Sequence, residues 1–331
     1  MELFTYTRAT DPTNASQAAS APTTSFVAGG TNLLDLMKLD IERPTQLIDI
    51  NHFGPDNITA KIERLPNNTL RIGALVRNAD LAHHPLILAD YPVLSQALLA
   101  GASAQLRNMA TTGGNLLQRT RCMYFRNTVM PCNKRSPGTG CSAIEGDNRS
   151  LALLGTSKHC IATNPSDMNV ALTALEAVVH IKGQTAELDV PISDFFLVPG
   201  TTPHIETVLA PGDLITHITL PAPPRHSKQI YLKLRDRASY EFALSSAAIV
   251  AEVTNNKFTF IRVALGGVGT KPWRSHEAEA ALLHHPANTA TFHRAAEAAL
   301  LDAHPQSENA FKVELAKRCL THALTLATHT A

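Results

Sequence analysis

The sequence predicts an α+β fold in two or three domains, and three observations favour this class. The chain has 331 residues, of which 44% are hydrophobic, so it can bury a sizeable core. Short β-prone runs alternate irregularly with short helical patterns over most of its length. A proline-rich stretch at residues 221–224 then precedes a region of three longer strands followed by helices. We therefore place a domain boundary at this stretch.

The hydrophobic patterns and helix signals predict the elements in order. Thr13 is expected to cap the first helix, and Pro165 to occupy the first position of the helix that contains Asp167. An acidic side chain there favours the positive end of the helix dipole. Strands are expected at 4–6, 25–28, 47–50, 69–74, 177–182, 185–190, 230–234, 247–252 and 258–265, and helices at 13–20, 32–37, 78–83, 92–101, from 164 onward, 275–283 and 307–327.

Composition argues against several classes of function. A formal net charge of +1 indicates no global attraction to nucleic acid or to a membrane surface. Aromatic residues make up 5% of the chain, which disfavours a stacking platform for single-stranded bases. No apolar run approaches the roughly 20 residues that a membrane-spanning helix needs. The first eight residues also lack the basic and apolar regions of an export signal.

Two glycine pairs point to a phosphate-bearing cofactor. Gly29-Gly30 follows a β-prone run, and Gly113-Gly114 repeats the same chemistry later in the chain. Because glycine has no side chain, such a pair allows positive φ and lets consecutive amides face a pyrophosphate. An isolated pair is equally typical of a plain turn, so the repetition matters. The Rossmann fingerprint is absent, since the nearest candidate, residues 267–272, ends in proline in place of the third glycine.

Four of the five cysteines follow the second glycine pair. Cys122, Cys132, Cys141 and Cys160 are separated by nine, eight and eighteen residues, and the loop at 127–148 among them has little periodicity. Four thiolates are the ordinary ligand set of a [4Fe–4S] cluster, whereas structural zinc usually has a shorter Cys-x₂₋₄-Cys spacing. Disulfides, with three possible pairings, are the other alternative.

The surroundings of these thiols suit a redox group. Residues 123–125 (Met-Tyr-Phe) are expected to shield a cluster from water, and Lys134 and Arg135 to offset its negative charge. Cys319 differs, because it lies on the apolar stripe of a helix and reads as a buried structural thiol.

Taken together, several segments resemble the FAD-binding subunit of the molybdenum hydroxylases, the family of xanthine dehydrogenase and aldehyde oxidoreductase. The resemblance runs over essentially the whole chain, and the four-cysteine insertion brings it closest to the flavin subunit of bacterial periplasmic aldehyde oxidoreductases. The segments that carry it are 26–33 (FVAGGTNL), 105–108 (QLRN) running into 111–115 (TTGGN), 165–168 (PSDM) and 262–268 (RVALGGV).

The resemblance implies a two-part FAD-binding fold of the vanillyl-alcohol oxidase type plus a C-terminal α+β domain. Residues 1–222 would form the FAD-binding domain, with subdomains at about 1–55 and 56–222. The iron–sulfur insertion would cover about 118–162, and the C-terminal domain 225–331.

The same resemblance implies the site residues. Asp167 would contact the sugar region of FAD, and Lys233 would lie near the flavin ring, where a cation favours reduced flavin. These residues also have purely structural interpretations. Asp167 would cap its helix, and Lys233 would lie on the exposed face of a strand. Arg107 and Asn108 would fix their loop through hydrogen bonds to backbone carbonyls. The implied FAD-binding residues are Phe26, Val27, Ala28, Gly29, Gly30, Thr31, Asn32, Leu33, Leu34, Thr111, Gly113, Gly114, Asn115, Asp167 and Lys233, and the implied cluster ligands are Cys122, Cys132, Cys141 and Cys160.

The function implied is electron transfer inside a heterotrimer. A large subunit with the molybdenum cofactor would oxidise an aldehyde, a small subunit would pass the electrons on through [2Fe–2S] clusters, and FAD here would deliver them to an external acceptor. The complex is expected in the periplasm, exported folded with a signal-bearing partner; the cytoplasm is the alternative. Two other hypotheses are a standalone flavin oxidase with a disulfide-stapled loop and a scaffold without cofactor, which the retained glycine pairs disfavour.

Overall fold

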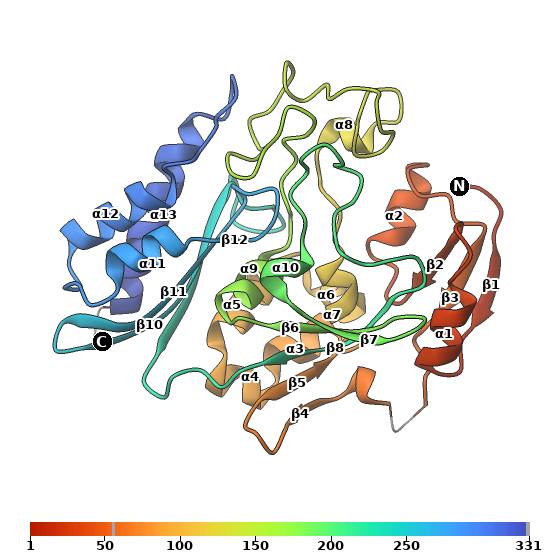
Figure 1. Ribbon diagram of the computed structural model, residues 1–331, viewed down its shortest axis with the longest axis horizontal. Coiled ribbons are helices and arrows are strands. Elements are labelled where there is room, and N and C mark those ends of the chain that lie inside the picture. Colours follow the sequence, from red (N-terminus) through yellow and green to blue (C-terminus); the bar gives the residue numbers. More distant parts are fainter. Residues whose placement is uncertain (55–56, 329–331) are drawn as a thin grey trace.

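The computed structural model describes residues 1–54 and 57–328 and has three sheets side by side (Figure 1). The first is parallel, in the order β1-β3-β2: β1 Thr5–Arg8, β3 Gln46–Asp49 and β2 Thr24–Val27. Helices α1 (Pro12–Ala18) and α2 (Leu33–Lys38) connect these strands. Asp11, not Thr13, caps α1. Pro12 takes the first helical position, and the Asp11 carboxylate accepts a hydrogen bond from the Asn14 amide at 2.8 Å.

The central sheet is antiparallel throughout, in the order β4-β5-β8-β6-β7. The two strands expected at 177–182 and 185–190 are confirmed and pair with each other, and β8 is a strand that was not predicted. The strands of the central sheet are β4 Ile62–Arg64, β5 Leu70–Gly73, β8 Leu214–Leu220, β6 Val178–Lys182 and β7 Glu187–Pro191. The expected subdomain division near residue 55 falls at residues 55–56, outside the described ranges.

Short helices pack on this sheet and form one core with it. Ser166, not Pro165, sets the start of α9: its hydroxyl accepts from the Asn169 amide at 3.1 Å, so Asp167 is the first helical residue. The helices are α3 Asn78–His83, α4 Pro85–Asp90, α5 Pro92–Ala100, α6 Ala104–Met109, α7 Thr112–Leu116, α9 Asp167–Ala174 and α10 Ile192–Phe195, with a 3₁₀ turn at Ile58–Ala60.

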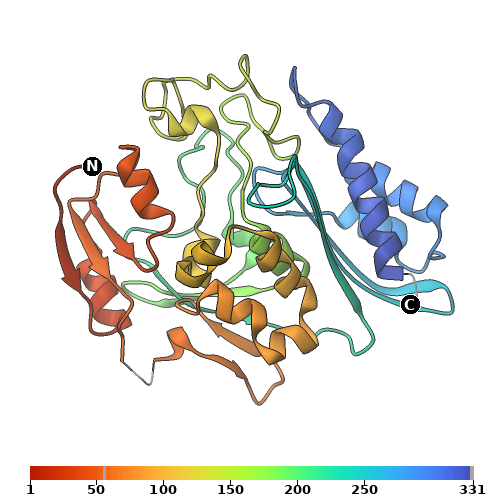
Figure 2. The same ribbon diagram turned by 180° about the vertical axis from the view of Figure 1, so that it is seen from behind.

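The C-terminal sheet is buried on both faces. Residues of β10 (Ser245–Thr254) alternate between two cores: Ala248 and Val250 belong to the core that includes α5 and α9, and Ala247, Ile249 and Ala251 to the core that includes three C-terminal helices. Figures 1 and 2 show these three helices on the side of the sheet that faces away from the central sheet. The order is β12-β11-β10-β9: β12 Trp273–Arg274, β11 Lys257–Gly266, β10 Ser245–Thr254 and β9 Lys228–Leu234, followed by α11 His276–Leu282, α12 Thr289–Ala299 and α13 Phe311–Thr328.

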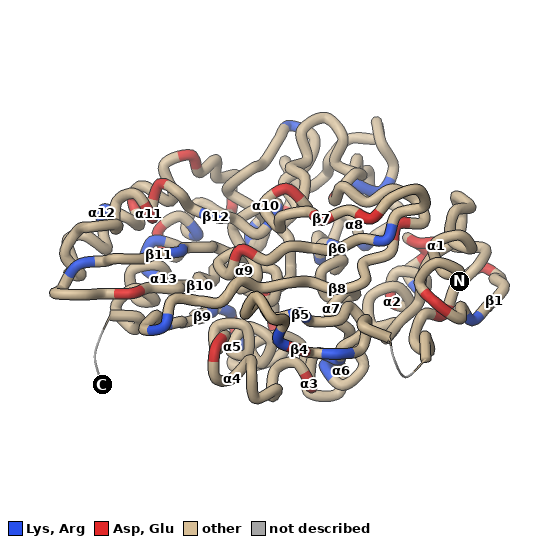
Figure 3. Tube along the Cα trace, turned by 60° about the horizontal axis from the view of Figure 1, so that its bottom comes forward, with Lys and Arg blue, Asp and Glu red and all other residues tan. Residues whose placement is uncertain are grey.

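The cysteine-bearing insertion forms a lobe with its own small core. Apart from α8 (Met123–Arg126) its backbone is irregular, as expected for the loop at 127–148. The C-terminal domain contacts the segment that leads back from the insertion. The Lys312 side-chain nitrogen donates to the Ser150 and Leu151 carbonyls of that segment at 3.0 and 2.8 Å, and to the Gly267 carbonyl of its own domain at 2.6 Å. None of the helices in the described part of the chain is both long and apolar enough to cross a bilayer. Basic and acidic residues are interspersed in the view of Figure 3.

Lys312 makes folding depend on pH. Its side chain is fully buried, and burial lowers its pKa to about 7, whereas an unfolded lysine ionises near 10.4. Between these two pKa values the unfolded state binds a proton that the folded state lacks. The contribution of Lys312 to the free energy of unfolding therefore rises with pH. We expect the melting temperature of wild type, relative to Lys312→Met, to increase from pH 7 to about pH 10. A difference that stays constant over this range would contradict the assignment.

Candidate cofactor groove and thiol cavity

The two glycine segments border one long groove. Two cavities, of about 390 and 510 Å³, meet where Thr31, Asn32 and Gly114 line both. The smaller runs along the residues after β2, and the larger continues between α5, α6 and β9 to Asp167 and Lys233. Each cavity has the size of a small-molecule site, and together they suit an elongated ligand. The structure thus brings both glycine segments, Asp167 and Lys233 to one groove.

The four glycines play different parts. Gly30 has a φ of 71°, which glycine adopts without strain. A Cβ on Gly29 would lie 1.9 Å from the Met109 carbonyl oxygen, so this glycine permits close packing of the first segment on α6. Gly113 packs against Ala74, and Gly114 leaves its face toward the groove bare, with only the Thr111 hydroxyl within 4 Å of an added Cβ.

The second glycine segment is the start of helix α7, not a loop. Thr111 caps the helix by accepting from the Gly114 amide at 3.2 Å. Among the four glycines only Gly30 has positive φ, so the expectation of positive φ does not extend to Gly113 and Gly114. Their requirement is space for a neighbouring backbone or a ligand.

Unpartnered polar atoms gather along the larger cavity. The Asn32 and Asn78 side-chain oxygens, the Arg121 Nε and one Arg126 Nη are buried, and no described residue bonds them. All four residues line the larger cavity. Buried polar atoms almost always have partners, so these mark a place where a ligand supplies hydrogen bonds. A dinucleotide such as FAD, rich in phosphate, hydroxyl and amide groups, fits this requirement.

A buried ion pair closes the far end of the groove. Lys233 lies 2.8 Å from Asp167, and their side chains are only 4% and 8% exposed. Lys233 also donates to the Ala100 carbonyl at 3.1 Å, and the Tyr231 hydroxyl donates to the other Asp167 oxygen. Burial raises the pKa of Tyr231 well above 10, so it stays protonated. The reading of Lys233 as an exposed strand residue is therefore wrong, and Asp167 is the partner of Lys233 at the start of α9.

The four thiols of the insertion line one narrow cavity. Cys122, Cys132 and Cys160 are buried, Cys141 is half-buried, and Cys132 and Cys141 pair through an isolated backbone bridge. All four cysteines are free, so the structure has no disulfide bond among them and does not support the disulfide alternative. As expected, Tyr124, Phe125 and Lys134 share this cavity, whereas Met123 is 57% exposed and shields nothing.

The four thiols are not arranged to share one metal ion. Four-coordinate zinc, with bonds of about 2.3 Å, holds its sulfurs within about 4 Å of each other. No three histidine, cysteine or acidic side chains among the described residues approach closely enough to share one metal ion. Burial, with the neighbouring thiols adding to it, raises the pKa of Cys122 to about 11, and burial raises that of Cys160 to about 12. Thiols so placed become thiolates only with a compensating positive charge, which a metal cluster provides.

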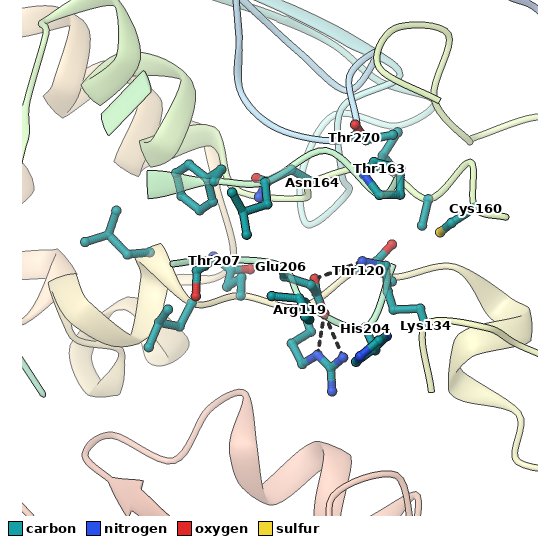
Figure 4. A pocket seen from close by; sticks show the side chains of 18 of the residues that line it. Arg119, Thr120, Lys134, Cys160, Thr163, Asn164, His204, Glu206, Thr207 and Thr270 are labelled. Carbon is teal, nitrogen blue, oxygen red and sulfur yellow. Dashed lines mark hydrogen bonds and ion pairs between the residues drawn. The ribbon is translucent and has the colours of Figure 1, made fainter. Parts of the chain in front are cut away.

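A third cavity, of about 410 Å³, lies beside the thiols (Figure 4). Arg119 lines it and pairs with Glu42 and Glu206, while its guanidinium lies 4.6 Å above the Phe125 ring. No sequence motif indicated this cavity. The groove residues Arg121 and Arg126 were also missed, although basic side chains flanking the first cysteine were a signal that could have been followed.

A dinucleotide-sized groove beside four free thiols, three of them buried, defines the class of protein as a redox flavoprotein. Comparison with known proteins agrees: residues 2–223 match the family described as the FAD binding domain in molybdopterin dehydrogenase. Residues 230–327 match the CO dehydrogenase flavoprotein C-terminal domain. The chain belongs to this family of FAD-binding oxidoreductase subunits, which confirms the resemblance and the fold class expected from the sequence.

Individual relatives are similar to the chain over most of its length. It is 53% identical over 326 residues to the aldehyde oxidoreductase FAD-binding subunit PaoB of Escherichia coli, covering 98% of each chain. It is 28% identical to the glyceraldehyde dehydrogenase medium chain of Sulfolobus acidocaldarius, covering 76% of this chain and 71% of that one. A carbon monoxide dehydrogenase structure from Hydrogenophaga pseudoflava superposes with a TM-score of 0.77 at 25% identity, covering 98% of this chain and 97% of that one.

Proposed function

We propose that this chain is the electron-transfer subunit of a heterotrimeric molybdenum aldehyde oxidoreductase and carries FAD and a [4Fe–4S] cluster. A large subunit would oxidise an aldehyde to a carboxylic acid at a molybdenum cofactor, and a small [2Fe–2S] subunit would pass on the electrons. The similarity to an aldehyde oxidoreductase subunit supports the substrate class. The observation that carries the proposal is the groove lined by both glycine segments, with the thiol cavity beside it.

The groove residues divide into those for the diphosphate and those for the ring system. Thr31 and Gly114 line both cavities, and Gly30 precedes Thr31 in the lining of the smaller one, so the main chain of these residues would hold the diphosphate. Asn32 and Asn78 would accept hydrogen bonds from the ligand with their unengaged side-chain oxygens. Lys233 reaches the groove with its charge balanced by Asp167, so the pair orients a ligand rather than adding net charge. When bound, FAD would supply a centre that takes up electrons one at a time and gives them up singly or in pairs.

The thiol cavity adjoins this groove through Arg121 and Arg126, which flank Cys122. Both pair with Asp35 of α2, at 3.1 Å for Arg121, and both line the larger groove cavity. Cys122, Cys132, Cys141 and Cys160 would hold the cluster, which supplies one-electron transfer when bound. The two arginines line the groove and are chain neighbours of Cys122 and Phe125, which line the thiol cavity.

A substitution at Gly114 tests the groove. Leucine there would project into the cavity, so Gly114→Leu is expected to reduce bound FAD from about one per chain to roughly a tenth or less. Flavin absorbance of the purified heterotrimer measures this. Gly138→Asn is the control, because an added Cβ at Gly138 meets nothing within 4 Å and asparagine tolerates its φ of 87°. Unchanged flavin in Gly114→Leu would remove this segment from the site.

Co-purification tests the assembly. When the chain is tagged and expressed together with a molybdenum-cofactor subunit and a [2Fe–2S] subunit from the same organism, we expect a stable complex with one copy of each. A tagged chain that purifies alone and oxidises aldehydes without partners would contradict the proposal. We also propose that the complex is periplasmic, which fractionation of cells checks.

A further inference from the structure

Two arginines of the cysteine-bearing insertion reach the groove close to the point where its two cavities meet. Arg121 and Arg126 lie on either side of Cys122 in the sequence, and both line the larger cavity. Each pairs with Asp35 in the first turn of α2, Arg121 at 3.1 Å. Asn32, which lines both cavities, lies three positions before Asp35, and side chains at this spacing are neighbours on a helix. The arginines are therefore held within about one helical turn of the junction.

The two guanidinium groups outnumber the carboxylate that they share. Both pair with the same oxygen of Asp35, so one positive charge is left without a counter-charge. The Arg121 Nε and the Arg126 Nη1 are buried, and among the described residues neither has a hydrogen-bond acceptor. Burial, and after it the charge of Arg126, lowers the pKa of Arg121. An anion bound here would balance the charge and accept from the free N–H groups.

The excess of positive charge belongs to the larger cavity and not to the smaller one. The charged side chains that line the smaller cavity are Arg119, Glu42 and Asp213, so it has no positive excess. Those that line the larger cavity leave a net charge of +2, and they are Arg107, Arg121, Arg126, Lys233 and Arg237 against Asp35, Asp167 and Glu241. A ligand with an anionic group near the junction is attracted toward the arginine side.

We infer that Arg121 and Arg126 bind the diphosphate of FAD, so that the insertion supplies part of the flavin site; the inference rests on the proposed function. The diphosphate is the anionic part of FAD, and the guanidinium fork matches phosphate oxygens in geometry and charge. The main chain at Thr31 and Gly114 and the two side chains of the insertion would share it. Asp35 is a positioning residue, because it holds both arginines on α2. A plain brace between the insertion and α2 would explain the ion pairs, but neither the free N–H groups nor the surplus charge.

Flavin binding to the deflavinated heterotrimer, measured by equilibrium dialysis, tests this inference. Arg121→Met and Arg126→Met are each expected to raise the Kd for FAD about tenfold or more, because each removes a hydrogen bond to a charged group. Riboflavin has the ring and the ribityl chain but no phosphate, so its Kd should not change. Raising potassium chloride from about 0.05 to about 0.5 M should narrow the difference between wild type and variant for FAD.

Arg149→Met is the matched control. Arg149 also belongs to the insertion and is also paired, with Asp236 at 2.8 Å, but it lines neither cavity of the groove. Its Kd for FAD should equal that of wild type. Arg126→Lys keeps the charge without the fork, so we expect its Kd to rise only a few-fold. Iron is measured on all samples, so that a variant whose insertion has unfolded is recognised.

An unchanged Kd for FAD in both methionine variants would overturn the inference. An equal loss for FAD and riboflavin, the same at both salt concentrations, would overturn it too, because a brace gives that pattern. If riboflavin binds wild type too weakly to measure, the salt dependence decides. If the methionine variants do not fold, Arg126→Lys decides, and a Kd equal to that of wild type would contradict the inference. A wild-type complex that binds no FAD contradicts the proposed function itself, whereas normal binding by wild type and by both arginine variants contradicts only this inference.

Discussion

Cys160→Ser is expected to lower the iron bound by this chain from about four atoms to fewer than one. Cys160 is 5% exposed and lines the thiol cavity with the three other cysteines. A serine hydroxyl is a poor ligand for a cluster, so the three remaining thiols would have to hold the cluster without a fourth thiolate. Iron analysis of the purified heterotrimer against protein concentration measures the change. FAD should remain, because Cys160 does not line the groove.

Cys319→Ala is the matched control for this loss. Cys319 is also free and fully buried, but it lies in the core of the C-terminal domain, where its sulfur faces the Leu232 carbonyl at 3.9 Å. Its substitution should cost stability through lost packing and leave iron unchanged. Equal iron content in wild type and Cys160→Ser would exclude Cys160 as a ligand.

Lys233→Met is expected to destabilise the chain by about 3–5 kcal/mol, the second large effect. The substitution leaves the Asp167 carboxylate buried with only the Tyr231 hydroxyl as partner, and an unpaired buried charge is strongly unfavourable. Denaturant unfolding of the apoprotein measures the loss without interference from flavin. The double variant Asp167→Leu with Lys233→Met should recover most of it, since a buried pair is often replaced by apolar groups at little cost.

Lys182→Met provides the comparison for an exposed pair. Lys182 lies 3.1 Å from Glu187, whose side chain is 76% exposed, so this substitution should cost no more than about 1 kcal/mol. A Lys233→Met variant as stable as Lys182→Met would mean that the buried pair does not hold β9 against α9.

The sequence predicted those features that depend on neighbours along the chain. Strand alternation located β6 and β7, helical patterns located α3 and α5, and the run of cysteines indicated the site that the thiol cavity forms. The observed helix starts differ from the predicted ones where neighbouring residues compete for the capping position, as at Asp11 and Ser166. Helix α12 was missed although Phe292, Ala295, Ala296 and Ala299 have helical spacing, because alanine adds little to the hydrophobic contrast.

The rest depends on contacts between distant segments. Lys233 meets Asp167 across 66 positions, and Arg119 joins Glu42 and Glu206 across 77 and 87. Each of these residues taken alone is typical of a solvated surface side chain. Only the packing of β9 on α9, and of the insertion on the loop at 196–209, turns them into a buried pair and a cavity wall. Such juxtapositions carry no local signal.

Metal and flavin analysis of the reduced heterotrimer, combined with electron paramagnetic resonance, tests the central claim most directly. The account predicts about one FAD and about four irons for this chain beyond those of the [2Fe–2S] subunit, with a resonance that disappears in Cys160→Ser. A complex that retains flavin but gives only the signals of its partner, with Cys122, Cys132, Cys141 and Cys160 all reactive toward a thiol reagent or joined in disulfides, would contradict it.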